Sequence, residues 1–107
     1  AGAFTLTPKR PPVNRNDMTN IKFNFQNKNV VVTGGASGIG FKITQSFLEA
    51  GGNVVIWDYS ENALQTARNE LSKFASQVTV QQVDVTNRAS VAQAIAALPA
   101  PVDIVIN

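Results

Sequence analysis

Residues 30–40 read VVVTGGASGIG, and this stretch decides the fold. Val30, Val31 and Val32 form a β-branched run of the kind found in strands that are buried on both faces. Four glycines follow within seven positions, at 34, 35, 38 and 40. Glycine at this density indicates backbone that turns sharply and lets another group approach closely. The stretch therefore predicts a strand, a glycine turn and the start of a helix.

A helix that begins directly after a glycine turn is suited to bind a phosphate. Its first N–H groups have no partners inside the helix, and they point at one spot together with the positive end of the helix dipole. Three of the glycines have separate expected roles. Gly34 ends the strand in a tight turn, Gly38 leaves room for a pyrophosphate against the backbone, and Gly40 lets the helix lie close to the strand.

Two other interpretations of the glycines have less support. A nucleoside-triphosphate P-loop needs Lys and then Ser or Thr directly after its last glycine, whereas Phe41 and Lys42 follow Gly40 here. A glycine-rich hairpin needs alternating strands on both sides. The valines do not alternate, and an amphipathic helix pattern follows the glycines.

The chain after Gly38 alternates between helix and strand patterns. Ser60 and Thr86 are the expected N-caps of the second and third helices, and the third helix is expected to bury Val91, Ile95 and Leu98. The order β-α-β-α-β-α-β predicts an α/β fold, a Rossmann-type doubly wound parallel sheet with right-handed crossovers and helices on both faces. The predicted helices span 38–50, 60–74 and 86–98, and the later strands span 53–57, 78–83 and 102–106.

Composition limits the chemistry of the chain. Its 107 residues, 44% hydrophobic and 15% charged, suit one small globular domain. Cysteine and histidine are both absent, so disulfides, thiolate metal sites and a histidine general base are excluded, and no metal site is predicted. No apolar run approaches the roughly 18 residues of a membrane span. We expect a cytoplasmic protein without a membrane partner.

Charge divides the chain into two parts. Residues 1–28 have a net charge of +4 and residues 29–107 a net charge of −2. The first part contains three prolines and no sustained apolar period, which predicts a basic tail and lead-in at 1–28, ahead of a dinucleotide-binding portion at 29–107. Because the positive charge lies in the tail, we expect no nucleic-acid partner. Phe23 and Phe25 are expected to cover one end of the sheet.

An acidic residue ends the second predicted strand. Asp58 stands 18 residues after Gly40, where a dinucleotide-binding fold places a carboxylate that accepts hydrogen bonds from the ribose hydroxyls. Such a carboxylate repels a 2′-phosphate, and no Lys or Arg occurs at 34–40 or 59, so NAD is favoured over NADP. Tyr59 is a candidate to pack beside the adenine. A plain turn role for Asp58 stays open.

The spacing Thr33-Gly34-x-x-x-Gly38-Ile39-Gly40 closely resembles the T-G-x-x-x-G-I-G signature of the short-chain dehydrogenase/reductase family. The resemblance extends over residues 29–107 and implies a nicotinamide-dependent oxidoreductase that acts on an alcohol or carbonyl, polyols and sugars included.

Two further positions match the family. Asp84-Val85 is similar to its Asp and small apolar residue after the third strand, and the Asp84 carboxylate could accept from the adenine amino group, with a helix-start role as the alternative. Asn107 is similar to the first Asn of its N-N-A-G segment. The predicted cofactor-binding residues are Gly34, Ser37, Gly38, Ile39, Gly40, Asp58, Tyr59, Asp84, Val85 and Asn107.

No catalytic residue is assigned in this sequence. In the family a Ser, a Tyr and a Lys four residues after the Tyr carry catalysis, whereas the single tyrosine here, Tyr59, is followed four positions later by Ala63. The resemblance implies the NAD(H)-binding half of an enzyme, truncated before its catalytic half, inactive alone and drawn from a homo-oligomeric parent. A free-standing dinucleotide-binding module without catalysis is the alternative. The substrate stays open.

Overall fold

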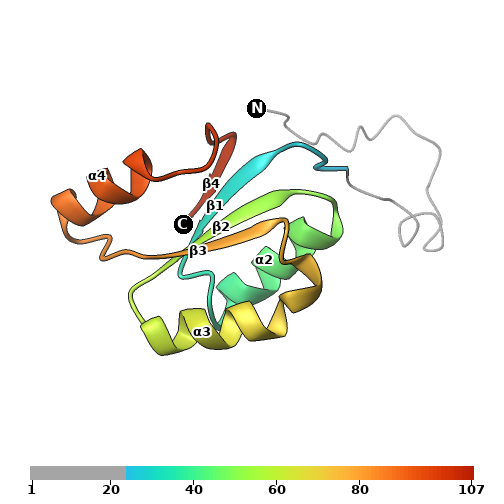
Figure 1. Cartoon of the computed structure of the whole chain (residues 1–107), viewed down its shortest axis with the longest axis horizontal. Helices are drawn as coiled ribbons and strands as arrows, with labels where there is room; N and C mark the ends of the chain where they lie inside the picture. Colours follow the sequence, from blue (N-terminus) through green and yellow to red (C-terminus); the bar gives the residue numbers. More distant parts are fainter. Residues whose placement is uncertain (1–23) are drawn as a thin grey trace, which may run out of the picture.

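The computed structural model describes residues 24–107. Four parallel strands form one sheet in the order β3-β2-β1-β4 (Figure 1). The predicted Rossmann-type α/β fold is confirmed. The strands are β1 (Asn29–Thr33), β2 (Asn53–Asp58), β3 (Val78–Gln82) and β4 (Ile104–Ile106), and the helices are α2 (Gly38–Glu49), α3 (Glu61–Glu70) and α4 (Arg88–Ala96), with a 3₁₀ turn at Ser72–Phe74.

The sheet has helices on both faces, as the element order predicts. Because side chains alternate along a strand, Val30 and Val32 face α2 and α3, whereas Val31 faces α4. Leu48 of α2 and Leu64 of α3 lie in the larger core, and burial of each such leucine stabilises the fold by about 1.5–3 kcal/mol. The valine run of β1 thus joins two cores, one on each face.

The segment just before β1 packs onto the end of α2. The Phe25 ring meets the Phe47 ring edge-on with centroids 4.9 Å apart, and the Phe25 N–H donates to the Ala50 carbonyl at 2.9 Å. Phe23 lies outside the described residues, as does the predicted tail up to that position. None of the helices in residues 24–107 is long and apolar enough to cross a membrane.

Helix caps agree with prediction in one case and differ in the other. The Ser60 side chain accepts from the Ala63 N–H at 3.1 Å and caps α3 as predicted. The prediction of Thr86 as the cap of α4 was wrong, because Asn87 caps that helix by accepting from the Ser90 N–H.

Two strand and helix patterns also differ from prediction. Ile95 of α4 is 55% exposed, so the predicted stripe is wrong there, and Ala94 is the residue that α4 buries. Strand β4 begins at Ile104 rather than at 102, and β3 ends at Gln82. These differences leave the topology unchanged.

Candidate functional site

The glycine turn after β1 bends through two residues with positive φ. Gly34 has φ +67° and Gly38 has φ +58°, a region that L-residues with a Cβ seldom adopt. A Cβ built at either position would meet no atom within 4 Å. These two glycines therefore face open space, which a ligand can enter.

Gly40 faces the opposite way, into the protein. A Cβ at this position would overlap the carbonyl oxygen of Gly34 and crowd the Cα of Gly35. The first turn of α2 consequently lies directly on the glycine turn. This is the close approach that the sequence predicts for Gly40.

The start of α2 presents unpaired N–H groups. Ser37 is the N-cap, in extended backbone, but its hydroxyl makes no capping hydrogen bond. The N–H groups of Gly38, Ile39 and Gly40 have no acceptor among residues 24–107, and the Phe41 N–H is the first to bond, to the Ser37 carbonyl at 3.2 Å. We call these three N–H groups the anion cradle, because with the helix dipole they favour a negatively charged ligand.

Asp58 lies beside the turn, at the end of β2. One carboxylate oxygen accepts from the Ala36 N–H at 3.3 Å, and the other accepts from the Ser60 N–H at 3.1 Å. The predicted turn role is therefore real, since the carboxylate joins the glycine turn to the start of α3. Each carboxylate oxygen has a further lone pair for a ligand hydroxyl. Two exposed apolar side chains, Ile39 (80%) and Tyr59 (72%), accompany it.

Asp84 follows β3 and is occupied in part by its own loop. Its Oδ1 accepts from the Thr86 hydroxyl at 2.6 Å and from the Thr86 N–H at 3.0 Å. These bonds favour the charged form and hold the pKa of the Asp84 carboxyl below its ordinary value of 3.8. Asp84 thus orders Thr86 in the loop before α4, although Thr86 is not the cap of that helix, and Oδ2 has no partner among residues 24–107. Its neighbour Val85 is 58% exposed.

The lowered pKa predicts a pH-dependent contribution of Asp84 to stability. A carboxyl whose pKa is lower in the folded than in the unfolded state stabilises the fold above the unfolded pKa, and this contribution is lost as the pH falls through the folded value. The stability difference between wild type and Asp84→Asn should be largest near pH 7 and disappear in strong acid. Urea unfolding at pH 7 and in strong acid, well below pH 3.8, measures it.

Glu49→Gln is the matched control for this comparison. Glu49 is an exposed carboxylate of α2 that makes no hydrogen bond or ion pair within the described residues. A difference for Asp84→Asn that does not change with pH, or one that Glu49→Gln reproduces, would contradict the role given to the Thr86 hydrogen bonds.

Asn107 lies where β4 meets β1. The Thr33 hydroxyl lies 3.1 Å from the Asn107 side-chain oxygen and 3.3 Å from the Ile106 carbonyl. Thr33 and Ala36 both hold predicted site residues, and sequence reasoning missed them in this role. Thr44 was missed too, although a polar residue on the buried side of an amphipathic helix is a signal that could have found it.

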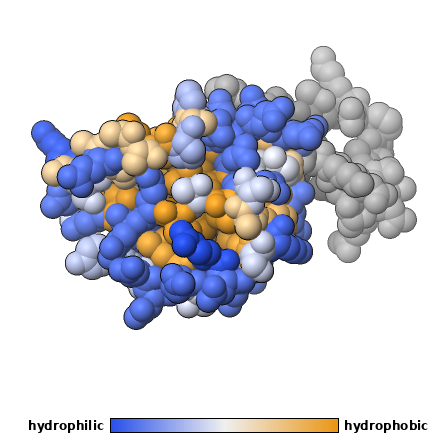
Figure 2. Space-filling view, in the orientation of Figure 1, coloured by the Kyte–Doolittle hydropathy of each residue, from blue (hydrophilic) through white to orange (hydrophobic). Residues whose placement is uncertain are grey.

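The predicted residues share one edge of the sheet. The glycine turn follows β1, Asp58 ends β2, Asp84 comes after β3 and Asn107 follows β4. Carboxyl ends of parallel strands form the edge where open α/β sheets bind ligands. One hydrogen bond joins Asp58 to the turn, whereas none joins Asp84 to it within the described residues. In Figure 2, apolar side chains gather in the middle of the view, between α3 and α4, with hydrophilic ones around them.

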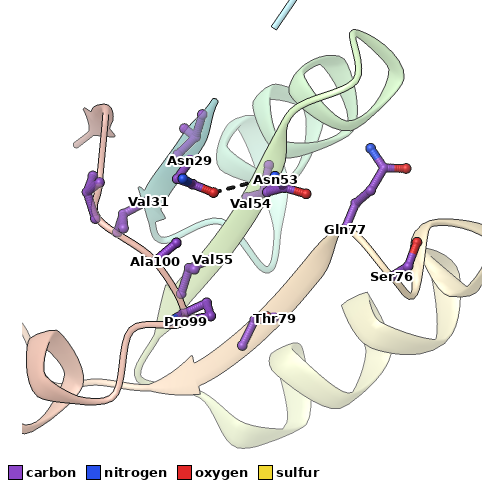
Figure 3. A pocket seen from close by; sticks show the side chains of 12 residues that line it. Asn29, Val31, Asn53, Val54, Val55, Ser76, Gln77, Thr79, Pro99 and Ala100 are labelled. Atoms are coloured by element: carbon purple, nitrogen blue, oxygen red, sulfur yellow. Dashed lines mark hydrogen bonds between the residues drawn. The ribbon is translucent and has the colours of Figure 1, made fainter. Parts of the chain in front are cut away.

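Two hollows lie along the faces of the sheet. One, of about 230 Å³, lies at the amino ends of β1 and β2, where the Asn53 side chain donates to that of Asn29 at 3.4 Å (Figure 3). The other, of about 690 Å³, is an apolar cleft between α4 and the sheet, lined by Val31, Trp57 and Ile95 among others. Neither contains the anion cradle.

Comparison with known proteins identifies the family. The model of short chain dehydrogenases matches residues 28–107, which include the whole sheet and the glycine turn. The chain belongs to the short-chain dehydrogenase family. This confirms the resemblance drawn from Thr33 to Gly40.

Relatives place this short-chain dehydrogenase chain among oxidoreductases. It is 48% identical over 58 residues to 3beta-hydroxysteroid dehydrogenase 2 of Eggerthella lenta, covering 54% of this chain and 22% of that protein. It is 41% identical over 85 residues to 3-oxoacyl-[acyl-carrier-protein] reductase FabG of Chlamydia muridarum, covering 76% of this chain and 34% of that protein. The RhlG/NADP active-site complex of Pseudomonas aeruginosa is similar in structure, with a TM-score of 0.71 and 32% identity. The match covers 80% of this chain and 34% of that protein. The chain thus spans about a third or less of the length of these proteins.

Proposed function

We propose that this chain is the NAD(H)-binding part of a short-chain dehydrogenase that transfers hydride between a nicotinamide cofactor and an alcohol or carbonyl substrate. The anion cradle carries the proposal. Its three unpaired N–H groups stand at a helix start, beside open space at Gly38, and the Asp58 carboxylate accepts from the N–H of Ala36, two residues before Gly38. A dinucleotide has the matching groups, a pyrophosphate next to a ribose.

Each predicted residue has a place in this proposal. The N–H groups of Gly38, Ile39 and Gly40 bind the pyrophosphate, and Gly34 and Ser37 border it. Asp58 accepts from the ribose hydroxyls. The remaining contacts are to the adenine and the rest of the cofactor, from Tyr59, Asp84, Val85 and Asn107. The nicotinamide ring supplies hydride transfer when bound.

The preference for NAD over NADP is supported by charge at the ribose. The Asp58 carboxylate would lie against a 2′-phosphate, and residues 34–40 and 59 contain no Lys or Arg to offset the repulsion. The RhlG structure named above holds NADP, so the family alone does not decide between the cofactors. The choice of NAD therefore depends on Asp58.

The whole enzyme's properties are part of the same proposal. The Ser, Tyr and Lys that catalyse hydride transfer in the family have no counterpart here, since the one tyrosine, Tyr59, is followed four positions later by Ala63. We therefore assign residues 29–107 to cofactor binding in a homo-oligomeric parent. The alternative is a free-standing dinucleotide-binding module without catalysis, which would not be part of a larger enzyme.

The test is titration of the purified chain with NADH. Trp57 is the only tryptophan, and it adjoins Asp58 at the end of β2, so bound NADH should quench its emission. We expect NADH to bind at least roughly tenfold more tightly than NADPH, a difference of about 1.4 kcal/mol. We also expect no NADH oxidation with any carbonyl.

Three results would refute parts of the proposal. Absence of NADH binding would refute the site, and equal affinity for both cofactors would refute the role of Asp58. Turnover by the pure chain would show that another group donates the proton.

A further inference from the structure

The buried side of α2 carries one polar side chain, Thr44, which has no exposed surface. Its hydroxyl lies 3.0 Å from the Gly40 carbonyl oxygen, one helical turn earlier, and 3.3 Å from the Gly35 carbonyl oxygen. No other donor in residues 24–107 contacts the Gly35 carbonyl. Since buried carbonyls need a donor, the Thr44 hydroxyl satisfies this part of the turn.

Gly35 and Thr44 are packed closely against each other. Gly35 is buried, and a Cβ there would lie 3.0 Å from both the Thr44 hydroxyl and the Val32 carbonyl oxygen. The hydroxyl thus lies at one of the points where the glycine turn packs against α2.

Three consecutive residues of the turn are each held by a different group. The Gly34 N–H donates to the Trp57 carbonyl at 2.7 Å, and the Ala36 N–H donates to the Asp58 carboxylate. Between them, the Gly35 carbonyl accepts from Thr44. Strand β2 therefore holds the turn on one side and α2 holds it on the other, and Thr44 supplies the bond from α2.

We propose that Thr44 is a positioning residue for the anion cradle. It touches no ligand, but its single hydroxyl proton, shared between the Gly35 and Gly40 carbonyl oxygens, ties the start of the segment that carries the three N–H groups to its end. Donors held in place bind an anion without a further ordering cost. This inference rests on the proposed function, because the ligand of the cradle is the dinucleotide pyrophosphate.

The test compares three variants of the purified chain. Thr44→Val keeps the side-chain shape and removes the hydroxyl, and Thr44→Ser keeps the hydroxyl. Thr66→Val is the matched control, because the Thr66 hydroxyl makes the same bond to a carbonyl four residues earlier, at 3.0 Å from Asn62, on the exposed side of α3. The readouts are NADH affinity and amide hydrogen exchange over residues 34–40.

We expect Thr44→Val to weaken NADH binding roughly tenfold, the equivalent of one neutral hydrogen bond, and to speed amide exchange over 34–40. Thr44→Ser should retain wild-type affinity and exchange, and Thr66→Val should change neither. If Thr44→Val does not fold, Thr44→Ala takes its place.

Opposite results separate this inference from the proposed function. Wild-type affinity in Thr44→Val, or equal losses in Thr44→Ser and Thr44→Val, would overturn the role of the hydroxyl. A wild-type chain that binds no NADH would refute the proposed function, and with it the role of Thr44 in binding. The exchange comparison would then still show whether the hydroxyl orders the turn.

Discussion

Replacing Gly40 with alanine is expected to lower the free energy of unfolding by about 3 kcal/mol, at the upper end of the usual cost of overpacking. The added Cβ would overlap the Gly34 carbonyl oxygen. That obstacle is backbone and cannot rotate away, so α2 must move off the glycine turn. Urea unfolding followed by Trp57 emission measures the loss.

Gly38→Ala is the matched variant for this prediction, because it makes the same change two residues away. Its Cβ meets no atom within 4 Å, so the structural cost is the positive φ alone, about 1–2 kcal/mol. The methyl group would, however, stand in the space proposed for the pyrophosphate. We expect NADH affinity to fall on the order of a hundredfold, about 2.7 kcal/mol.

The two glycine variants should thus fail in different ways. Gly40→Ala loses stability first, and Gly38→Ala loses binding while the protein stays folded. Wild-type stability in Gly40→Ala would contradict the close approach of α2 to the turn. Wild-type NADH affinity in Gly38→Ala would remove the anion cradle from the proposed site.

Removing the charge of Asp58 is expected to shift the cofactor preference toward NADP. A carboxylate about 4 Å from a 2′-phosphate costs on the order of 1–4 kcal/mol, depending on the effective dielectric constant. This corresponds to roughly ten- to a thousandfold in the ratio of NADPH to NADH affinity. Tyr59→Arg, combined with removal of the Asp58 charge, should extend the shift, because the arginine pairs with the 2′-phosphate of NADPH.

Asp58→Asn tests the charge of Asp58 more specifically than Asp58→Ala does. Asp58 accepts from the Ala36 N–H and the Ser60 N–H, so Asp58→Ala would loosen the turn and the start of α3 as well as remove the charge. Asp58→Asn keeps one acceptor oxygen in place. Comparing the two variants separates the charge effect, which changes the cofactor ratio, from loss of order, which weakens both cofactors alike.

Asp103→Asn is the control for the loss of a carboxylate. Asp103 also accepts from a backbone N–H, that of Asn29 at 2.8 Å, but it precedes β4 and so lies at the opposite edge of the sheet. Its removal should leave the cofactor ratio unchanged. If Asp58→Asn leaves the ratio unchanged too, Asp58 serves only the turn, and the NAD assignment fails.

The main elements could be predicted because their signals are local. The valine run of β1 and the NVVIW run of β2 are typical of buried strands, and both strands form where predicted. Ser60 caps α3 because its hydroxyl has no competing partner. At α4 two polar residues compete, and Asp84 binds the Thr86 hydroxyl, which leaves Asn87 as the cap.

The position of the candidate site could be predicted from the sequence, whereas the hydrogen bonds that hold it in place could not. The T-G-x-x-x-G-I-G spacing locates the turn, and the strand ends locate Asp58 and Asp84. The bonds from Ala36 to Asp58 and from Thr44 to Gly35 depend on how elements pack, which periodicity does not specify. Ile95 shows the same limit, since its exposure depends on how α4 rests on the sheet.

The position of β1 inside the sheet has a consequence for the order of assembly. Val30 pairs with Val54 on one side and with Ile104 on the other. Closing the longer loop costs about 1 kcal/mol more chain entropy than closing the shorter one, because that cost grows with the logarithm of loop length. The β1-β2 pair should therefore form before the β1-β4 pair.

Until β4 arrives, one side of β1 is an unpaired edge of three consecutive valines. Such an edge is a template for pairing with another chain. During synthesis it would stay open until the residues of β4 have left the ribosome. A strand that is buried on both faces of the finished fold is thus expected to be the main aggregation risk of the unfinished one, and the most dependent on chaperones.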